Sequence, residues 1–281
     1  MKGREAKGAA ARDAGAFVWV PGWGMPPAVW APVWPHLAYA AVHVAVDWAG
    51  CRAPGDFSHV VRAAVSQARE AGGGPVTVVA WSLGSLVTLS MARDMARDVA
   101  ALVLVGATAR FVAAPDWPHG WDERALRRFA RRFARDPAST WRAFVDDLFA
   151  PGERVEEPDP RRRLLRAPPV DDALAALAFL AACDARGDLA HCRVPVRLLH
   201  GSADAVCPLS GARALAGALP NARLTVWCGA GHAPHVARPR AFARWLAAEL
   251  AALRRADDAT RVRSGPHEGA GKAVVRADAP D

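Results

Sequence analysis

Cysteine is scarce in this sequence of 281 residues, and its spacing argues against two kinds of structural site. The cysteines are odd in number and scattered, with no C-x-x-C pair: Cys51, Cys183, Cys192, Cys207 and Cys228. Neither a disulfide framework nor a zinc site is expected from such spacing. Free thiols are typical of a reducing compartment, so we predict a cytoplasmic protein.

Long apolar runs are also missing. No segment approaches the ~20 apolar residues that a membrane-spanning helix needs. Residues 1–15 are charged and rich in alanine and glycine, and they lack the apolar core of a signal peptide. We therefore predict a soluble protein with no membrane partner. Apolar residues still make up 52% of the chain, which is enough for a sizeable core.

Lysine is also scarce, although the chain is basic. Only three lysines are present, so the formal net charge of +8 comes almost wholly from arginine. Two interpretations stay open: the arginines attract an anionic partner, or they reflect the composition of a GC-rich genome. We do not predict nucleic acid as the partner, because the sequence has no recognised nucleic-acid-binding module.

Short apolar segments alternate with helical patterns over most of the chain. Strands are predicted at 16–20, 42–46, 76–80, 101–105, 194–200 and 223–228, and helices at 30–37, 57–71, 83–97, 210–219 and 239–254. Continuously apolar strands between helices indicate an α/β fold, with a mostly parallel sheet covered on both faces. The alternation stops between residues 110 and 189, which we predict to be a helical lid inserted into a core of 15–109 and 190–254. Residues 1–14 and 255–281 are predicted to be disordered.

Ser82 stands where a predicted strand turns sharply into a helix. The residues two before and two after it are small, Ala80 and Gly84. This is the pattern of a nucleophile elbow, in which the serine backbone is strained and strand and helix must pass closely. On this segment alone, an ordinary crossover with an incidental serine remains an alternative.

An acid and a histidine follow Ser82 in the order Ser, Asp, His. Asp204 lies in a polar turn after the strand 194–200, and His232 lies in the glycine-rich turn after the last strand. Both should project from the carboxyl edge of the sheet, and this order is that of α/β-hydrolases. A serine hydroxyl needs such a base and an orienting acid to become nucleophilic. His235 is a rival base that lacks the glycine flank.

The transition state also needs hydrogen-bond donors for the developing oxyanion. The Leu83 N–H, at the helix start behind the serine, is one candidate. The Trp23 N–H is the second, because Trp23 lies between two glycines in the loop after the first strand.

Five short motifs resemble the pimeloyl-[acyl-carrier protein] methyl ester esterase family, which consists of lidded α/β-hydrolases. They are Pro21-Gly22-Trp23-Gly24-Met25, Trp81-Ser82-Leu83-Gly84, Gly231-His232-Ala233-Pro234, Ala109-Arg110-Phe111 and Asp116-Trp117-Pro118. The resemblance extends over about residues 16–250. It implies a Ser82, Asp204 and His232 triad, with an oxyanion hole made by the Trp23 and Leu83 amides.

The resemblance also implies a substrate. The family removes the methyl ester from a pimeloyl chain attached to acyl-carrier protein, and it needs no metal or cofactor. Phe144 falls where the family's lid has an aromatic lining the acyl channel, and Leu148 would share its helical face. Ala80, Pro21 and Ser85 depart from the family pattern, which bears on efficiency more than on reaction type.

Arginines recur at helical spacing in the predicted lid: Arg124, Arg127, Arg128, Arg131, Arg132 and Arg135. They share one face of a helix, and the opposite face is apolar. The family's lid arginines receive the carrier protein, and this face, together with Arg142, would do the same here. A solvated basic face is the alternative.

We therefore predict a monomeric serine carboxylesterase acting on pimeloyl-[acyl-carrier protein] methyl ester. A broad carboxylesterase on small free esters is the nearest alternative. A non-catalytic relative that only binds a ligand is the other, and the intact triad argues against it.

Overall fold

The computed structural model describes residues 15–37, 41–156, 159–160, 164 and 166–263, with side chains up to residue 256. Six strands form one sheet in the order β2-β1-β3-β4-β5-β6, and every neighbouring pair is parallel. The strands are β1 (Ala16–Val20), β2 (Val42–Ala45), β3 (Val76–Trp81), β4 (Val99–Val105), β5 (Val196–Gly201) and β6 (Ala222–Trp227). The predicted α/β-hydrolase architecture is thus confirmed, with a sheet that is wholly parallel over these strands.

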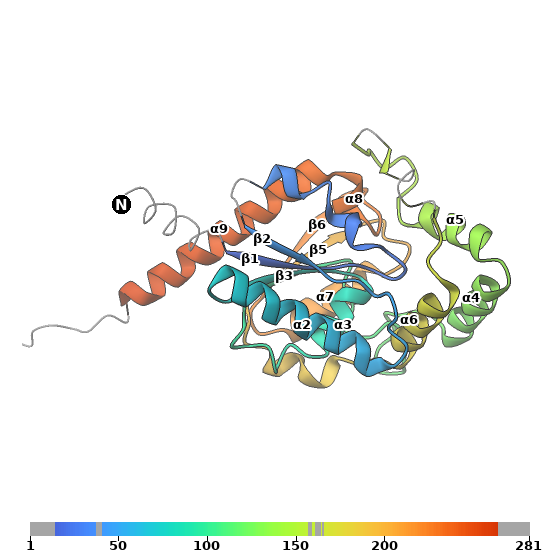
Figure 1. The fold of residues 1–281 in the computed structure, drawn as a ribbon, viewed down its shortest axis with the longest axis horizontal. Coiled ribbons are helices and arrows are strands. Elements are labelled where there is room, and N and C mark those ends of the chain that lie inside the picture. The colour runs from blue at the N-terminus through green and yellow to red at the C-terminus, as the bar shows by residue number, and fades with distance from the viewer. Residues whose placement is uncertain (1–14, 38–40, 157–158, 161–163, 165, 264–281) are drawn as a thin grey trace, which may run out of the picture.

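Helices cover both faces of the sheet. α2 (Pro54–Gly72) and α3 (Leu83–Leu89) lie on one face, and α8 (Pro234–Ala237) and α9 (Pro239–Arg263) lie on the other (Figure 1). α2 buries Phe57, Val61, Ala64, Val65 and Ala68, whose spacing places them on one helical face. α7 (Leu209–Ala218) connects β5 to β6.

The structure corrects three of the predicted helices. Residues 30–37 form short 3₁₀ turns, η1 (Pro27–Trp30) and η2 (Trp34–His36), because prolines interrupt the segment. α3 ends at Leu89, beyond which bonds such as Met91 N–H to the Thr88 carbonyl tighten the chain into turns.

The third correction concerns the end of the chain. α9 continues to Arg263, so residues 255–263 are helical instead of belonging to the predicted tail. The other segments predicted as disordered, 1–14 and 264–281, lie outside the described residues. No described helix is long and apolar enough to cross a membrane.

Among the described residues between β4 and β5, three helices lie at one end of the molecule beyond the strands (Figure 1). They are α4 (Glu123–Arg135), α5 (Pro137–Asp147) and α6 (Val170–Ala182), followed by the short η4 (Arg186–His191). Aspartate side chains cap the first two: Asp122 accepts the Ala125 N–H, and Asp136 accepts the Ser139 N–H. We call residues 110–189 the helical insert.

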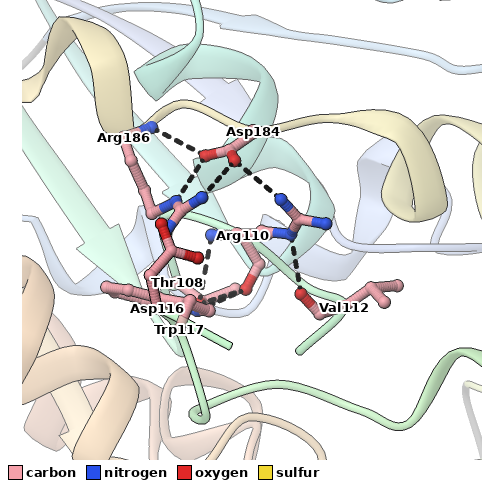
Figure 2. Close-up of polar contacts among 7 residues, drawn as sticks. All are labelled: Thr108, Arg110, Val112, Asp116, Trp117, Asp184 and Arg186. Atoms are coloured by element: carbon pink, nitrogen blue, oxygen red, sulfur yellow. Dashed lines mark hydrogen bonds and ion pairs between the residues drawn. The ribbon is translucent and has the colours of Figure 1, made fainter. Parts of the chain in front are cut away.

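An ionic cluster fastens the two ends of the helical insert together (Figure 2). Asp184 binds Arg110 at 2.9 Å and the Arg186 guanidinium at 2.7 and 2.8 Å. Arg186 also binds Asp116 at 2.8 Å, and the Trp117 indole N–H donates to the Arg110 carbonyl. The hydrogen bonds from Arg186 lower the pKa of Asp184 to about 2. Asp184 therefore stays ionised across the physiological range, and the cluster stays paired.

Candidate active site

Ser82 has a strained backbone at the tip of the β3–α3 turn. Its φ of 53° is the only positive value of a non-glycine residue in the described part of the chain. Such strain costs about 1–3 kcal/mol and persists only where the surroundings impose it. They do so here: the Ser82 N–H donates to the Val105 carbonyl at 2.9 Å, and α3 begins at the next residue.

Two small residues permit this turn, as the sequence pattern predicts. A Cβ atom at Gly84 would come within 2.6 Å of the Val20 carbonyl oxygen and 2.7 Å of that of Pro21. Ala80 is fully buried between β1 and β4, so its extra methyl group is accommodated. Ser85, the departure from glycine, donates its hydroxyl to the Ala80 carbonyl at 2.9 Å and leaves no buried polar atom unpaired.

Asp204 and His232 form a buried pair at the same edge of the sheet. His232 Nδ1 lies 2.7 Å from Asp204 Oδ2, while Asp204 Oδ1 accepts the backbone N–H groups of Val206 and Cys207. Burial opposes ionisation of Asp204, but His232 and these donors still hold its pKa below the usual value. The pair therefore presents an ionised carboxylate to the Nδ1 side of the imidazole.

The other ring nitrogen of His232, Nε2, is available to accept a proton. Nε2 is buried and has no hydrogen-bond partner among the described residues. The ring packs against Gly106, where an added Cβ would lie 2.8 Å from its Cε1 and Nδ1 atoms. Gly106 directly follows Val105, which binds the Ser82 N–H, so Ser82 and His232 both lie against the end of β4. The Trp81 indole also donates to the His232 carbonyl.

His200 is a member of the site that the sequence analysis did not single out. Its Nε2 lies 2.8 Å from the Cys207 carbonyl and 3.2 Å from Asp204 Oδ2. Both oxygens only accept hydrogen bonds, so Nε2 must bear the proton. Burial lowers the pKa of His200 and keeps it neutral. Its place four residues before Asp204, at the end of a strand, is the signal that could have identified it.

His235, the rival base, belongs to the core. Both of its ring nitrogens are buried without a partner in the described structure. The ring packs 4.4 Å from Trp30 and 4.6 Å from Trp81, measured between centroids. Burial lowers the pKa of His235 well below the ordinary value, so the ring is neutral.

An apolar pocket opens over Ser82. Besides the serine, it is lined by Trp23, Phe111, Trp121, Leu126, Phe129, Phe144, Leu177, Leu180 and Val206. Most of these residues belong to the helical insert. The water-accessible space is ≈ 20 Å³, room for about one water molecule. The pocket is therefore narrow, with too little free space for an acyl chain.

Of the two predicted pocket residues on α5, only Phe144 lines the pocket. Its ring meets Trp23 edge-on, with the centroids 4.8 Å apart. Leu148, the residue that follows α5, is fully buried and does not line the pocket. The Leu148 carbonyl accepts the Ala233 N–H instead. Leu126 and Phe129 come from the predicted apolar face opposite the arginines, whereas Leu177, Leu180 and Val206 were not predicted as pocket residues.

The two predicted oxyanion donors flank the serine turn. Leu83 is the first residue of α3, so its N–H has no acceptor within the helix. Trp23 is held by its indole N–H, which donates to the Ala173 carbonyl at 2.9 Å. The loop before it is fixed by the Trp48 indole, which donates to the Pro21 carbonyl.

The arginines of α4 form an exposed stripe. All six on α4 are exposed, whereas Leu126 and Phe133 on its other face are buried. Arg127 pairs with Glu123, and Arg132 lies over the Phe129 ring. Arg128, Arg131, Arg132 and Arg135 line an open hollow of the surface. Arg142 is exposed on α5.

Comparisons with known proteins agree with this geometry. The model of the alpha/beta hydrolase family matches residues 17–245. The pimeloyl-[acyl-carrier protein] methyl ester esterase of Aromatoleum aromaticum is 36% identical over 78% of this chain and 91% of its own. The esterase of the same name from Xanthomonas campestris pv. campestris is 32% identical over 85% and 96%.

A solved structure shows the same fold at lower identity. An esterase from Exiguobacterium antarcticum superposes with a TM-score of 0.68 at 18% identity, over 84% of this chain and 91% of its own. The chain belongs to the alpha/beta hydrolase family and, within it, to the family of the pimeloyl-[acyl-carrier protein] methyl ester esterases.

Proposed function

We propose that this protein hydrolyses the methyl ester of pimeloyl-[acyl-carrier protein], releasing methanol and the carrier-bound acid for biotin precursor synthesis. The observation behind the proposal is the strained Ser82, which lies at an apolar pocket beside the Asp204–His232 pair. The names of the relatives supply the substrate. The fold alone does not, because many activities share it.

The geometry supports a Ser-Asp-His mechanism. His232 Nε2 accepts the hydroxyl proton as Ser82 attacks the ester carbonyl, and Asp204 holds the Nδ1–H and stabilises the imidazolium. The Trp23 and Leu83 amides donate to the tetrahedral oxyanion. Methanol leaves with the proton from His232. Water then attacks the acyl-enzyme with the same base, which frees the acid and restores Ser82.

The pocket lining suits a neutral ester on a methylene chain. Except for Ser82, the lining is made of aliphatic and aromatic side chains. An ionised carboxylate would find no cation among these lining residues, so the methyl ester is favoured over the free acid product. Because the pocket has room for only about one water molecule, the helical insert acts as a lid that must shift to admit the acyl chain.

The partner we propose is the acidic carrier protein, which docks on the arginine stripe of α4 and Arg142. We further propose a cytoplasmic monomer, in keeping with the scattered free cysteines.

The test is to compare turnover of pimeloyl-[acyl-carrier protein] methyl ester with that of dimethyl pimelate. We expect kcat/KM to be at least about tenfold higher for the carrier-bound ester, because the charged surface speeds encounter. Mass spectrometry of the carrier conjugate reports loss of the methyl group. Equal turnover of both esters would favour the broad carboxylesterase. A protein that neither turns over ester nor reacts with a fluorophosphonate at Ser82 would be a binding protein.

Charge reversal on α4 separates docking from chemistry. Replacing Arg128, Arg131 and Arg135 by Glu should raise KM for the carrier-bound ester by about tenfold, with less effect at high salt. Hydrolysis of a small free ester should change less than about twofold, because these exposed side chains lie outside the pocket lining. KM and kcat on both esters check this.

The matched control for charge reversal replaces three exposed arginines of α7 and α9, Arg213, Arg244 and Arg255, by Glu. It changes the net charge equally and should leave KM unchanged. If the two triple variants raise KM equally, the effect comes from the net charge of the protein and not from docking on α4. If the α4 variant loses turnover of both esters, the substitutions have damaged the helical insert.

A further inference from the structure

The segment that follows α5 lies against the loop that bears His232. We call residues 148–153 the α5 exit segment and residues 229–233 the histidine loop. An added Cβ at Gly231 would lie 2.6 Å from both the Ala150 nitrogen and the Leu148 oxygen. The Ala233 N–H donates to that same Leu148 carbonyl at 3.1 Å. Two segments far apart in the chain therefore touch immediately beside His232.

Glu153 makes the strongest of these contacts. Its Oε2 accepts the Gly231 N–H at 2.8 Å and the Ala150 N–H at 3.0 Å, so one carboxylate oxygen ties the two segments together. The Glu153 side chain is only 1% exposed. Arg238 Nη2 lies 3.9 Å from its other oxygen, and the Arg238 guanidinium rests on the Trp227 ring. Oε1 has no hydrogen-bond partner among the described residues, so the two backbone N–H groups at Oε2 are what hold this buried carboxylate in place.

The backbone around His232 is thus restrained from two directions. The N–H groups on either side of it, at Gly231 and Ala233, bind the α5 exit segment. Its own carbonyl binds the Trp81 indole, next to the serine turn. The helical insert supplies two of these three restraints, although it contributes no member of the Ser82, Asp204 and His232 set.

We propose that Glu153 is a positioning residue for His232, one that makes the placement of the general base depend on the helical insert. This inference rests on the proposed catalytic roles of Ser82 and His232. Phe144, in the pocket wall, and Leu148, at the exit, belong to one continuous stretch of chain around the end of α5. Movement of α5 by a bound acyl chain is therefore transmitted to the histidine loop through Leu148 and Glu153.

The test measures chemistry on a small ester, p-nitrophenyl acetate, which does not need the carrier protein. Glu153→Ala should lower kcat by about 10- to 100-fold and leave KM within about twofold, because a displacement of about 1 Å at a catalytic group costs this much. The rate of fluorophosphonate labelling at Ser82 should fall by the same factor. Glu153→Gln keeps an oxygen acceptor for both N–H groups and should restore most of the rate.

Glu156 offers a matched control in the same stretch of chain. Its carboxylate accepts the backbone N–H groups of Arg240 and Ala241 at the start of α9, away from the histidine loop. Glu156→Ala should keep kcat within about twofold. A folded Glu153→Ala with wild-type kcat, or equal losses in the two alanine variants, would overturn the proposal.

Three further outcomes are also decisive. Should Glu153→Ala fail to fold, Glu153→Asp keeps the charge beside Arg238 but is one methylene too short to reach both N–H groups; unchanged kcat in that variant would refute the positioning role. Wild-type protein that reacts at Ser82 but leaves the carrier-bound ester intact would refute the proposed substrate without affecting this test. Wild-type protein inert toward both probes would overturn the catalytic role and this proposal together.

Discussion

Ser82→Ala is expected to lower kcat for ester hydrolysis by on the order of 10⁶-fold while the fold stays intact. The hydroxyl is the proposed nucleophile, and no neighbour can replace it. Ser85, three residues on, has its hydroxyl committed to the Ala80 carbonyl. Cys207 is completely buried beside Asp204, and burial raises the pKa of its thiol well above the ordinary value. Steady-state rates and a thermal melt of the purified variant provide the measurement.

Ser85→Ala is the control for this substitution, since it removes a hydroxyl from the same turn. It loses one buried hydrogen bond, worth about 1 kcal/mol of stability, and should retain most of the activity. Alanine, like serine, has a β-carbon, so Ser82→Ala does not change the backbone strain at this position. The surroundings that impose the positive φ are also unchanged, and the turn should keep its conformation. A Ser82→Ala protein with wild-type turnover would falsify the nucleophile assignment.

His232→Ala should be nearly as damaging as loss of the serine, because the two act as one unit in such triads. His235→Ala should leave kcat within about tenfold of the wild type. His235 cannot act as the base at the serine, since its ring is enclosed by Trp30, Trp81 and Phe242. Its replacement creates a cavity and should lower stability by about 2–5 kcal/mol.

The two histidine variants are therefore expected to differ in their turnover of ester. Both variants remove a fully buried ring and should melt several degrees lower, but only His232→Ala should lose turnover, whereas His235→Ala should keep turning over ester. Parallel kinetics distinguish them, and melting curves measure the loss of stability in each. If His235→Ala is the inactive variant and His232→Ala the active one, the base has been assigned to the wrong ring.

Much of the proposed site could be predicted from sequence because its residues have local signatures. Ser82 is flanked by residues small enough for the turn, and Asp204 and His232 each follow a strand whose apolar run is plain. Parallel strands bring their carboxyl ends to one edge, so local patterns sufficed to predict a long-range arrangement. The helical insert was predicted from the interruption of the same alternation.

The residues that were missed act through contacts that no local pattern encodes. Glu153 lies in an irregular segment, and 78 residues separate it from Gly231, whose N–H it binds. Leu148 has the spacing of a pocket residue, but the structure buries it outside the pocket lining, where its carbonyl accepts the Ala233 N–H. Helix ends depend on capping and tertiary contacts, which also explains the misjudged limits of α3 and α9.

The ionic cluster at Arg110 and Asp184 has a consequence for how this architecture diversifies. The two residues form a bridge between adjacent backbones, so the helical insert begins and ends at nearly the same point. Closing a loop at fixed ends costs only about 0.6 kcal/mol more for each doubling of its length. Segments of quite different size and sequence can therefore be grafted between these two positions with little penalty to the sheet. Substrate range and partner choice can evolve there while the serine turn stays as it is, provided that a new segment keeps the contacts that Glu153 and Leu148 make with the histidine loop.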